Sequence, residues 1–225
     1  RDLLRSHHLF ASAEPRLIDA LLQFATTKVF QADAAIFRKG EPGDALYGIL
    51  EGRARVFVEG PDGREVILNI LEAGSIFGEI ALLDGSTRTA SVAALEKCKV
   101  LRLPRAHFLP ILRREPDLAL NIIELLCQRL RWTSAVIEDS AFLDLRGRLA
   151  KRLLVLADTF GQSDARGTRI KVRLTQKSLA AMLMVTREAV NKQVAEWREN
   201  GVIEMDDGYI VVRDLATLTA MVIAD

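Results

Sequence analysis

Residues 77–92 read F-G-E-I-A-L-L-D-G-S-T-R-T-A-S-V, and the rest of the chain is interpreted from this stretch. Gly78 lets the backbone approach a ligand closely, and the run E-I-A-L-L after it is expected to form a short helix whose free amides attract an anion. Arg88 carries a permanent planar cation that fits a phosphate at two points, and Thr89 adds a hydroxyl donor. A phosphate would repel Glu79, so this carboxylate is better suited to accept a hydrogen bond from a ribose hydroxyl. The stretch predicts a pocket for a small phosphorylated ligand.

The two charges also have an ordinary interpretation. Taken singly, Glu79 and Arg88 are more often surface charges, or partners in one ion pair, than ligand contacts. The combination F-G-E-[apolar]-A-L followed by R-T-A-S-V, however, resembles the phosphate-binding cassette of cyclic-nucleotide-binding domains. The residues that this resemblance places around the ligand are Gly78, Glu79, Ile80, Ala81, Arg88 and Thr89.

Length and composition bound what can surround this pocket. The chain has 225 residues, of which 49% are hydrophobic, so it can bury a sizeable core and divide into two domains. No uninterrupted apolar run approaches the ~18 residues that span a bilayer, and the opening R-D-L-L-R does not build a signal peptide. A cytoplasmic protein without a membrane partner is expected. Cys98 and Cys127 are too few and too far apart for an iron–sulfur or zinc set, and the histidines show no metal-ligand spacing, so no metal is expected.

Basic residues gather in one part of the chain. Residues 145–192 contain eleven Lys or Arg and three acids, a net charge of +8, whereas the whole chain carries +1. Such an excess is typical of a polyanion-binding module, but it arises equally often on solvated helix faces.

The first half of the chain has the pattern of a β domain behind a helical start. Residues 1–25 are expected to be helical, with Leu17, Leu21 and Phe24 on one apolar stripe. From residue 28 to 104, short runs rich in Val, Ile and Phe alternate with glycines, which argues for an antiparallel barrel or jelly roll. The strands named by this pattern are 35–37, 46–50, 54–58, 66–68 and 100–103.

A long helix is predicted after Pro116, because neither Gly nor Pro follows until Gly147. Apolar and small residues repeat along it at spacings of 4, 3, 4, 3 and 4, which is the pattern of a coiled-coil seam and favours a symmetric dimer over packing against the helix's own barrel. Ser134 lies on this seam, and Thr133 points about 100° away from it. Both hydroxyls could touch a ligand held near the seam. The seam residues are Ile123, Cys127, Leu130, Ser134, Ile137 and Ala141.

The last third of the chain predicts a DNA-binding module. Asp144 can cap a helix with a leucine stripe, residues 141–144 are a candidate hinge, and 161–168 reads as an exposed loop. Two helices capped by Thr175 and Thr186 then flank a tight turn at Met184-Val185. A hairpin at Asp206-Asp207-Gly208 follows, which completes a winged helix-turn-helix. The exposed face of the second helix carries Arg187, Glu188, Asn191 and Lys192.

In this order the parts resemble the Crp/Fnr family of bacterial transcription regulators over almost the whole chain, and its cyclic-AMP receptor proteins most closely. The resemblance implies an α+β fold with a β-roll domain at 1–115, a dimerisation helix and hinge at 116–143, and a winged helix-turn-helix at 144–225. It implies a homodimer that binds cyclic AMP as allosteric effector, palindromic double-stranded DNA, and RNA polymerase.

The resemblance also assigns residue roles. The Thr-Ser pair within R-L-R-W-T-S, Thr133 and Ser134, would read the adenine, one within the subunit and one from across the dimer. The residues implied at the DNA are Thr175, Gln176, Thr186, Arg187, Glu188, Asn191 and Lys192. Arg187 and Lys192 would suit guanine acceptors, and Glu188 a cytosine amino group.

Three residues depart from the family pattern. Lys192 replaces the usual Arg and loses the planar fork, which could relax preference at one base pair. Met184 stands where the turn often has Gly, at a cost on the order of 1 kcal/mol if the residue is left-handed. Thr89 replaces the usual Ser and resembles cyclic-GMP-binding domains, which leaves dual specificity open.

Two other classes of function are alternatives. An effector-independent, other-effector or redox-sensing regulator of the same fold is one, although the chain lacks the cysteine cluster of an iron–sulfur sensor. An enzyme acting on a cyclic nucleotide is the other, but hydrolysis needs a metal cluster or an activated nucleophile, and the sequence offers neither constellation.

Overall fold

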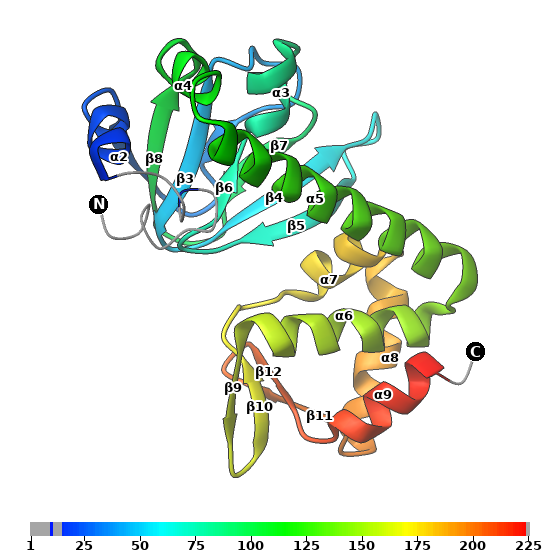
Figure 1. Ribbon diagram of the computed structural model, residues 1–225. Helices are drawn as coiled ribbons and strands as arrows, with labels where there is room; N and C mark the ends of the chain where they lie inside the picture. Colours follow the sequence, from blue (N-terminus) through cyan, green and yellow to red (C-terminus); the bar gives the residue numbers. More distant parts are fainter. Residues whose placement is uncertain (1–9, 11–14, 224–225) are drawn as a thin grey trace. The chain divides into compact units, whose positions relative to one another are not determined.

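The computed structural model describes Phe10 and residues 15–223. The chain divides into two compact units, Arg1–Leu130 and Arg131–Asp225. Helix α5, Pro116–Phe142, contributes to both (Figure 1). No helix among the described residues is long and apolar enough to cross a membrane.

The first unit contains two four-stranded antiparallel sheets, ordered β1-β8-β3-β6 and β2-β7-β4-β5. Their strands are β1 Thr26–Phe30, β2 Ala35–Phe37, β3 Ala45–Glu51, β4 Ala54–Glu59, β5 Glu65–Leu71, β6 Ile76–Phe77, β7 Ser91–Ala94 and β8 Cys98–Pro104. The five predicted strands are confirmed as β2, β3, β4, β5 and β8, and the predicted jelly-roll class with them. Strands β1, β6 and β7 were not predicted: β1 is largely exposed, β6 has only two residues, and β7 begins within the 77–92 stretch that was interpreted as a ligand-binding segment.

Three helices pack against this β domain and contribute buried side chains to its core. They are α2 Pro15–Leu22, α3 Glu79–Asp84 and α4 Arg105–Leu112. Of the predicted apolar stripe, only Leu21 is fully buried, and it packs with Ile18. Phe24 lies beyond α2, is 45% exposed and stacks on His107 at 3.8 Å between ring centroids, so its place on the helical stripe was wrong. The rest of the predicted helix at 1–25 falls largely outside the described residues.

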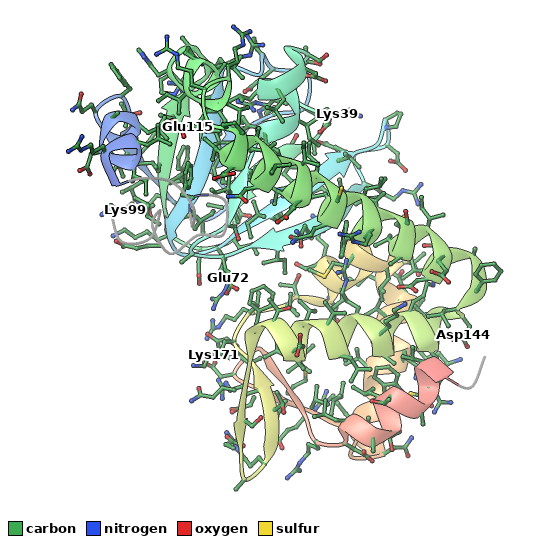
Figure 2. All side chains as sticks on the ribbon, in the orientation of Figure 1. Lys39, Glu72, Lys99, Glu115, Asp144 and Lys171 are labelled. Carbon is green, nitrogen blue, oxygen red and sulfur yellow. The ribbon has the colours of Figure 1, made fainter. Side chains whose placement is uncertain are left out.

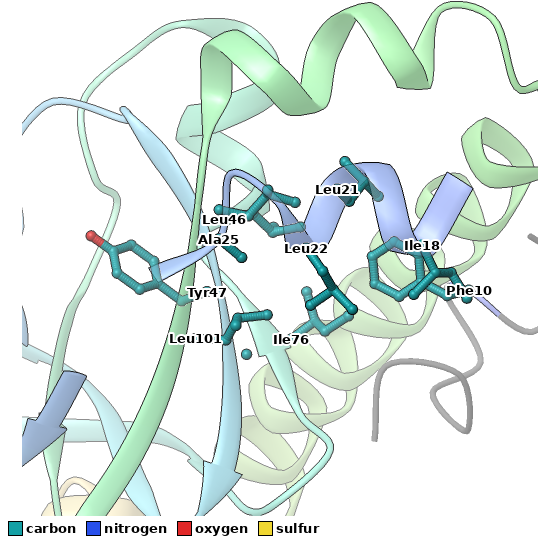
Figure 3. A pocket seen from close by; sticks show the side chains of 11 residues that line it. Phe10, Ile18, Leu21, Leu22, Ala25, Leu46, Tyr47, Ile76 and Leu101 are labelled. Carbon is teal, nitrogen blue, oxygen red and sulfur yellow. The ribbon is translucent and has the colours of Figure 1, made fainter. Parts of the chain in front are cut away.

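Beneath α2 lies an apolar cavity in the core of the first unit (Figure 3). Side chains from α2 and from strands β3, β6 and β8 line it together, and Phe10 closes one side. Because these side chains belong to the buried cluster that also holds Phe108 and Leu118, α2 acts as a cap on the β domain.

The long helix predicted after Pro116 is confirmed as α5, with 27 residues. It packs on the first unit through Leu118 and Ile122, which are 2% and 3% exposed. The predicted seam lies on another face and is exposed: Ile123 at 54%, Leu130 at 68% and Ile137 at 65%. One face of α5 therefore packs on the β domain, while the seam on another face stays exposed.

A short break at 143–144 separates α5 from α6, Leu145–Phe160. As predicted, Asp144 caps α6, since its Oδ1 accepts a hydrogen bond from the Gly147 amide at 2.7 Å. Asp144 lies at the break between the two helices (Figure 2).

The second unit is a winged helix-turn-helix, as predicted. Its helices are α6, α7 Gln176–Leu183, α8 Arg187–Glu199 and α9 Leu215–Ile223, and its sheet has the order β11-β12-β10-β9. The strands are β9 Gly161–Asp164, β10 Gly167–Ile170, β11 Ile203–Asp206 and β12 Tyr209–Val212. Val190, Val194 and Trp197 anchor α8 in the core, as their spacing predicted.

Two elements of this unit differ from the sequence-based expectation. The predicted loop at 161–168 is wrong: β9 and β10 form a hairpin there, and β10 pairs with β12 through Thr168 and Val212. All of β9 is exposed, so its residues carry no apolar alternation to reveal a strand. Helix α9 was not predicted, although Asp214 caps it by accepting bonds from the Thr217 amide and hydroxyl, which also lower the pKa of Asp214.

Candidate functional site

Gly78 joins β6 to α3 at φ +82°, a left-handed conformation that favours glycine. A Cβ here would lie 2.8 Å from Nη1 of Arg88. The left-handed backbone therefore favours glycine, and any larger residue would also have to displace the Arg88 guanidinium; α3 begins at Glu79 as predicted.

Arg88 lies almost wholly inside the β domain, 3% exposed. Its Nη1 donates to the Gly78 carbonyl and its Nη2 to the Ala45 carbonyl, each at 2.8 Å. The Phe37 ring lies 4.4 Å from the guanidinium carbon, and Asp44 is 3.4 Å from Nη2. Within the described part of the chain, Nε is buried without a hydrogen-bond acceptor. The guanidinium is thus fixed in place, and its Nε–H is left as a buried donor without an acceptor among the described residues.

Glu79 is even more buried, 1% exposed. Its Oε1 lies 3.1 Å from Nε of Arg129, and Oε2 has no hydrogen-bond partner among the described residues. The ordinary interpretation of the two charges is therefore wrong: neither is on the surface, and each is paired with a different residue. Burying a carboxylate without full hydrogen bonding costs free energy, which a ligand hydroxyl can offset.

Both groups line one hollow of about 360 Å³ in the first unit. All six predicted cassette residues, 78–81, 88 and 89, line it. Of the other lining residues, Phe77, Ala90 and Val92 belong to the 77–92 stretch but were not named as ligand contacts, whereas Phe37, Val56 and Arg129 lie outside it and were missed. Arg129 opens the R-L-R-W-T-S stretch, one helical turn before Thr133, and this spacing was the available signal for it.

Thr133 and Ser134 follow on α5 in the second unit, and both residues are exposed. Their contact with a ligand stays a prediction.

The helix-turn-helix exposes three of the four residues of the predicted face, and the fourth, Asn191, is half-buried with its Oδ1 shielded from water. The Oγ1 atoms of Thr175 and Thr186 accept bonds from the amides of Ser178 and Ala189 and so cap α7 and α8. Arg187, Glu188 and Lys192 are exposed, Asn191 and Gln176 half-buried. No ion pair in the described part of the chain occupies the charges at 187, 188 and 192. These side chains are available to a partner.

Met184 ends α7 in the left-handed conformation, φ +56° and ψ 40°. We expect Met184→Gly to be more stable than Met184→Ala by about 1 kcal/mol, because both remove the same exposed side chain but only alanine keeps the left-handed strain. Urea unfolding of the two variants measures the difference. Equal free energies of unfolding would show that the turn stores no such strain.

Comparison with known proteins covers both units. Residues 27–115 match the cyclic nucleotide-binding domain family, and residues 147–221 match the Crp-like helix-turn-helix domain family. The chain is 31% identical over 213 residues to the CRP-like cAMP-activated global transcriptional regulator of Mycobacterium tuberculosis, covering 95% of each chain. The chain belongs to the Crp/Fnr family. It is also 31% identical over 215 residues to the cyclic AMP receptor protein of Thermus thermophilus, covering 96% of each.

This Crp/Fnr protein has the family's fold throughout. It superimposes on the c-di-GMP responsive global regulator CLP of Xanthomonas campestris with a TM-score of 0.79 at 21% identity, over 89% of this chain and 100% of that one. The chain is accordingly a DNA-binding transcription regulator with a cyclic-nucleotide-binding domain, and its relatives are regulators rather than enzymes. Regulators of this family bind DNA, typically as dimers.

Proposed function

We propose that a cyclic nucleotide, cyclic AMP first, binds in the hollow beside α3 and controls sequence-specific DNA binding by a homodimer. The supporting observation is the pair of buried atoms without hydrogen-bond partners among the described residues, Nε of Arg88 and Oε2 of Glu79. A free donor on a fixed cation suits a cyclic phosphate, and a free acceptor on a carboxylate suits a ribose hydroxyl. The M. tuberculosis relative is named as cAMP-activated, which favours the same effector.

Calorimetric titration tests the effector directly. We expect cyclic AMP to bind the full chain, and Thr89 gives a reason to titrate cyclic GMP beside it. Cyclic di-GMP is the third ligand to test, because CLP responds to it. Binding of cyclic di-GMP alone would replace the proposed effector, and binding of none would favour an effector-independent regulator.

Control of DNA binding is tested by linkage. Ligand contacts at Thr133 and Ser134 would favour one conformation of α5, and the hinge at 141–144 would transmit this conformational preference to the DNA-binding part. DNA must then tighten ligand binding by the factor by which ligand tightens DNA binding, typically 5 to 150. Gel-shift titrations with and without cyclic AMP measure that factor, and identical affinities would exclude the coupling.

The exposed seam of α5 supports the dimer. In a single chain the seam leaves Ile123, Leu130 and Ile137 exposed to water. Pairing with a second copy of the helix would remove this apolar area from solvent. The proposed division of the chain is a β-roll domain at 1–115, the dimerisation helix and hinge at 116–143, and the DNA-binding domain at 144–225.

Cys127 lies on the same seam, exposed, and gives a test of the dimer. In a parallel pair of helices each Cys127 faces its copy, at a separation suited to a disulfide. We expect mild oxidation to yield a covalent dimer that dithiothreitol reverses and that Cys127→Ser abolishes. Cys98→Ala is the control, since Cys98 is buried and burial raises its pKa to about 11. A monomer in sedimentation analysis would refute the dimer.

In the second unit we propose that α8 enters the DNA major groove. Arg187, Glu188, Asn191 and Lys192 would then face base edges, while Thr175, Gln176 and Thr186 would contact the backbone. A two-fold dimer predicts a palindromic site with half-sites about 34 Å apart. RNA polymerase is the proposed protein partner of the DNA-bound form.

A further inference from the structure

A second hollow, of about 570 Å³, lies wholly inside the second unit, far in sequence from the cassette. The last turns of α5, the first half of α6 and the end of α7 enclose it. Its charged lining residues are Asp139, Arg148, Lys151 and Arg152. Three cations against one carboxylate make it an electropositive site.

Among the charged side chains that line this hollow, one cation has no hydrogen-bond acceptor or ion-pair partner in the described part of the chain. Lys151 forms an ion pair with Asp139. Arg148 donates from Nη1 to the Leu183 carbonyl at 3.2 Å. Arg152 makes no hydrogen bond or ion pair with any described residue; its guanidinium carbon lies 5.6 Å from the Trp132 ring centroid. Burial lowers the pKa of Arg152, against the smaller opposing effect of Asp139.

A half-buried guanidinium without an acceptor is unfavourable, because burial removes water and nothing described replaces it. The cation–π contact with Trp132 recovers only part of the lost hydration. The lining also includes apolar side chains, the planar indole of Trp132 beside the charge and the two valines Val136 and Val155. A ligand that fits this lining would carry an anionic group attached to an apolar, planar body.

We propose that this hollow binds a small organic anion, whose carboxylate or phosphate meets Arg152 and whose apolar body packs on Trp132 and the valines. The far wall is Met182, Leu183 and Met184, the end of α7 and the turn that precedes α8. An occupant would contact the helix-turn-helix directly. The hollow would therefore be a second effector site, independent of the cassette.

The test uses the full chain and reads tryptophan fluorescence, since Trp132 lines the hollow while Trp197, the other tryptophan, is fully buried. We expect phenyl phosphate or benzoate to change the emission saturably, and the stronger of the two identifies the anionic group. Trp132→Phe should remove the signal. Saturating cyclic AMP should leave the titration in place, so the result does not depend on the effector proposed above.

Arg152→Gln is expected to weaken this binding about tenfold or more, as loss of a charge-assisted bond does. Arg146→Gln, exposed on the same helix and outside the hollow, should bind as the unaltered chain does. Arg152→Lys keeps the charge and should retain most of the binding, which separates lost charge from lost folding. Absence of a saturable change with either probe, equal weakening by the changes at 146 and 152, or equal affinity for inorganic phosphate would overturn the proposal.

Discussion

Arg88→Leu is expected to lower the affinity for cyclic AMP by about 2–5 kcal/mol, roughly 30-fold to several thousand-fold. Arg88 is 3% exposed, so a phosphate bound beside its guanidinium would be largely shielded from water. Leucine would leave that phosphate buried without a positive partner, and the loss would appear mainly as faster dissociation. Calorimetry of the purified variant measures it.

The arginine also supports the fold, so the experiment needs controls. Its bonds to the carbonyls of Gly78 and Ala45 disappear in the leucine variant. Arg88→Lys keeps a charge, and we expect it to bind more weakly than the unaltered chain but more tightly than Arg88→Leu. Arg102→Leu is the matched control, because Arg102 shares Asp44 with Arg88 but does not line the hollow. A folded Arg88→Leu with unchanged affinity would remove the cassette from the ligand site.

The cassette could be predicted from sequence because its constraints are local. Gly78, Glu79 and the short helix follow one another along the chain, and each residue type has a direct physical reason there. Arg129 could not be predicted in the same way, since it reaches Glu79 only after α5 has packed on the β domain. Part of the apolar wall, Phe37 and Val56, likewise comes from strands distant in sequence, so only the folded sheet brings Phe37 to Arg88.

The same distinction explains the elements that the sequence pattern missed. Strand β10 is ordered by pairing with β12, more than forty residues later, and its four residues alone carry little signal. By contrast, α5 and α8 were predicted well, because a long helical period and a capping threonine are both readable within one segment. The exposed seam on α5 is another local pattern whose meaning requires a second copy of the chain.

Electrostatic attraction alone does not explain how the second unit would choose a DNA site. Many basic residues lie in 145–192, and any of them can attract phosphates without regard to sequence. Base readout requires side chains that are both exposed and not held by internal pairs. Among the described residues of α8, Arg187, Glu188 and Lys192 meet this requirement on the predicted DNA-facing side, and Arg187 lies in the first turn; Arg198 is also exposed but lies in the last turn, at the opposite end of the helix.

Arg187→Ala is therefore expected to cost about 1–3 kcal/mol, roughly 5- to 150-fold, in binding to a palindrome selected with the unaltered chain. The fold should be unaffected, because an exposed substitution usually changes stability by less than about 0.5 kcal/mol.

Binding of Arg187→Ala to unrelated DNA should keep nearly the same salt dependence, since a base contact contributes to affinity for the selected site only. Arg198→Ala removes an equal charge from the same helix, and we expect it to leave the preference for the palindrome intact. Gel shifts of both variants on selected and scrambled duplexes at several salt concentrations separate the two effects. If Arg187→Ala weakened both duplexes equally and flattened the salt dependence, Arg187 would be a phosphate contact, and sequence reading would have to come from Glu188, Asn191 and Lys192.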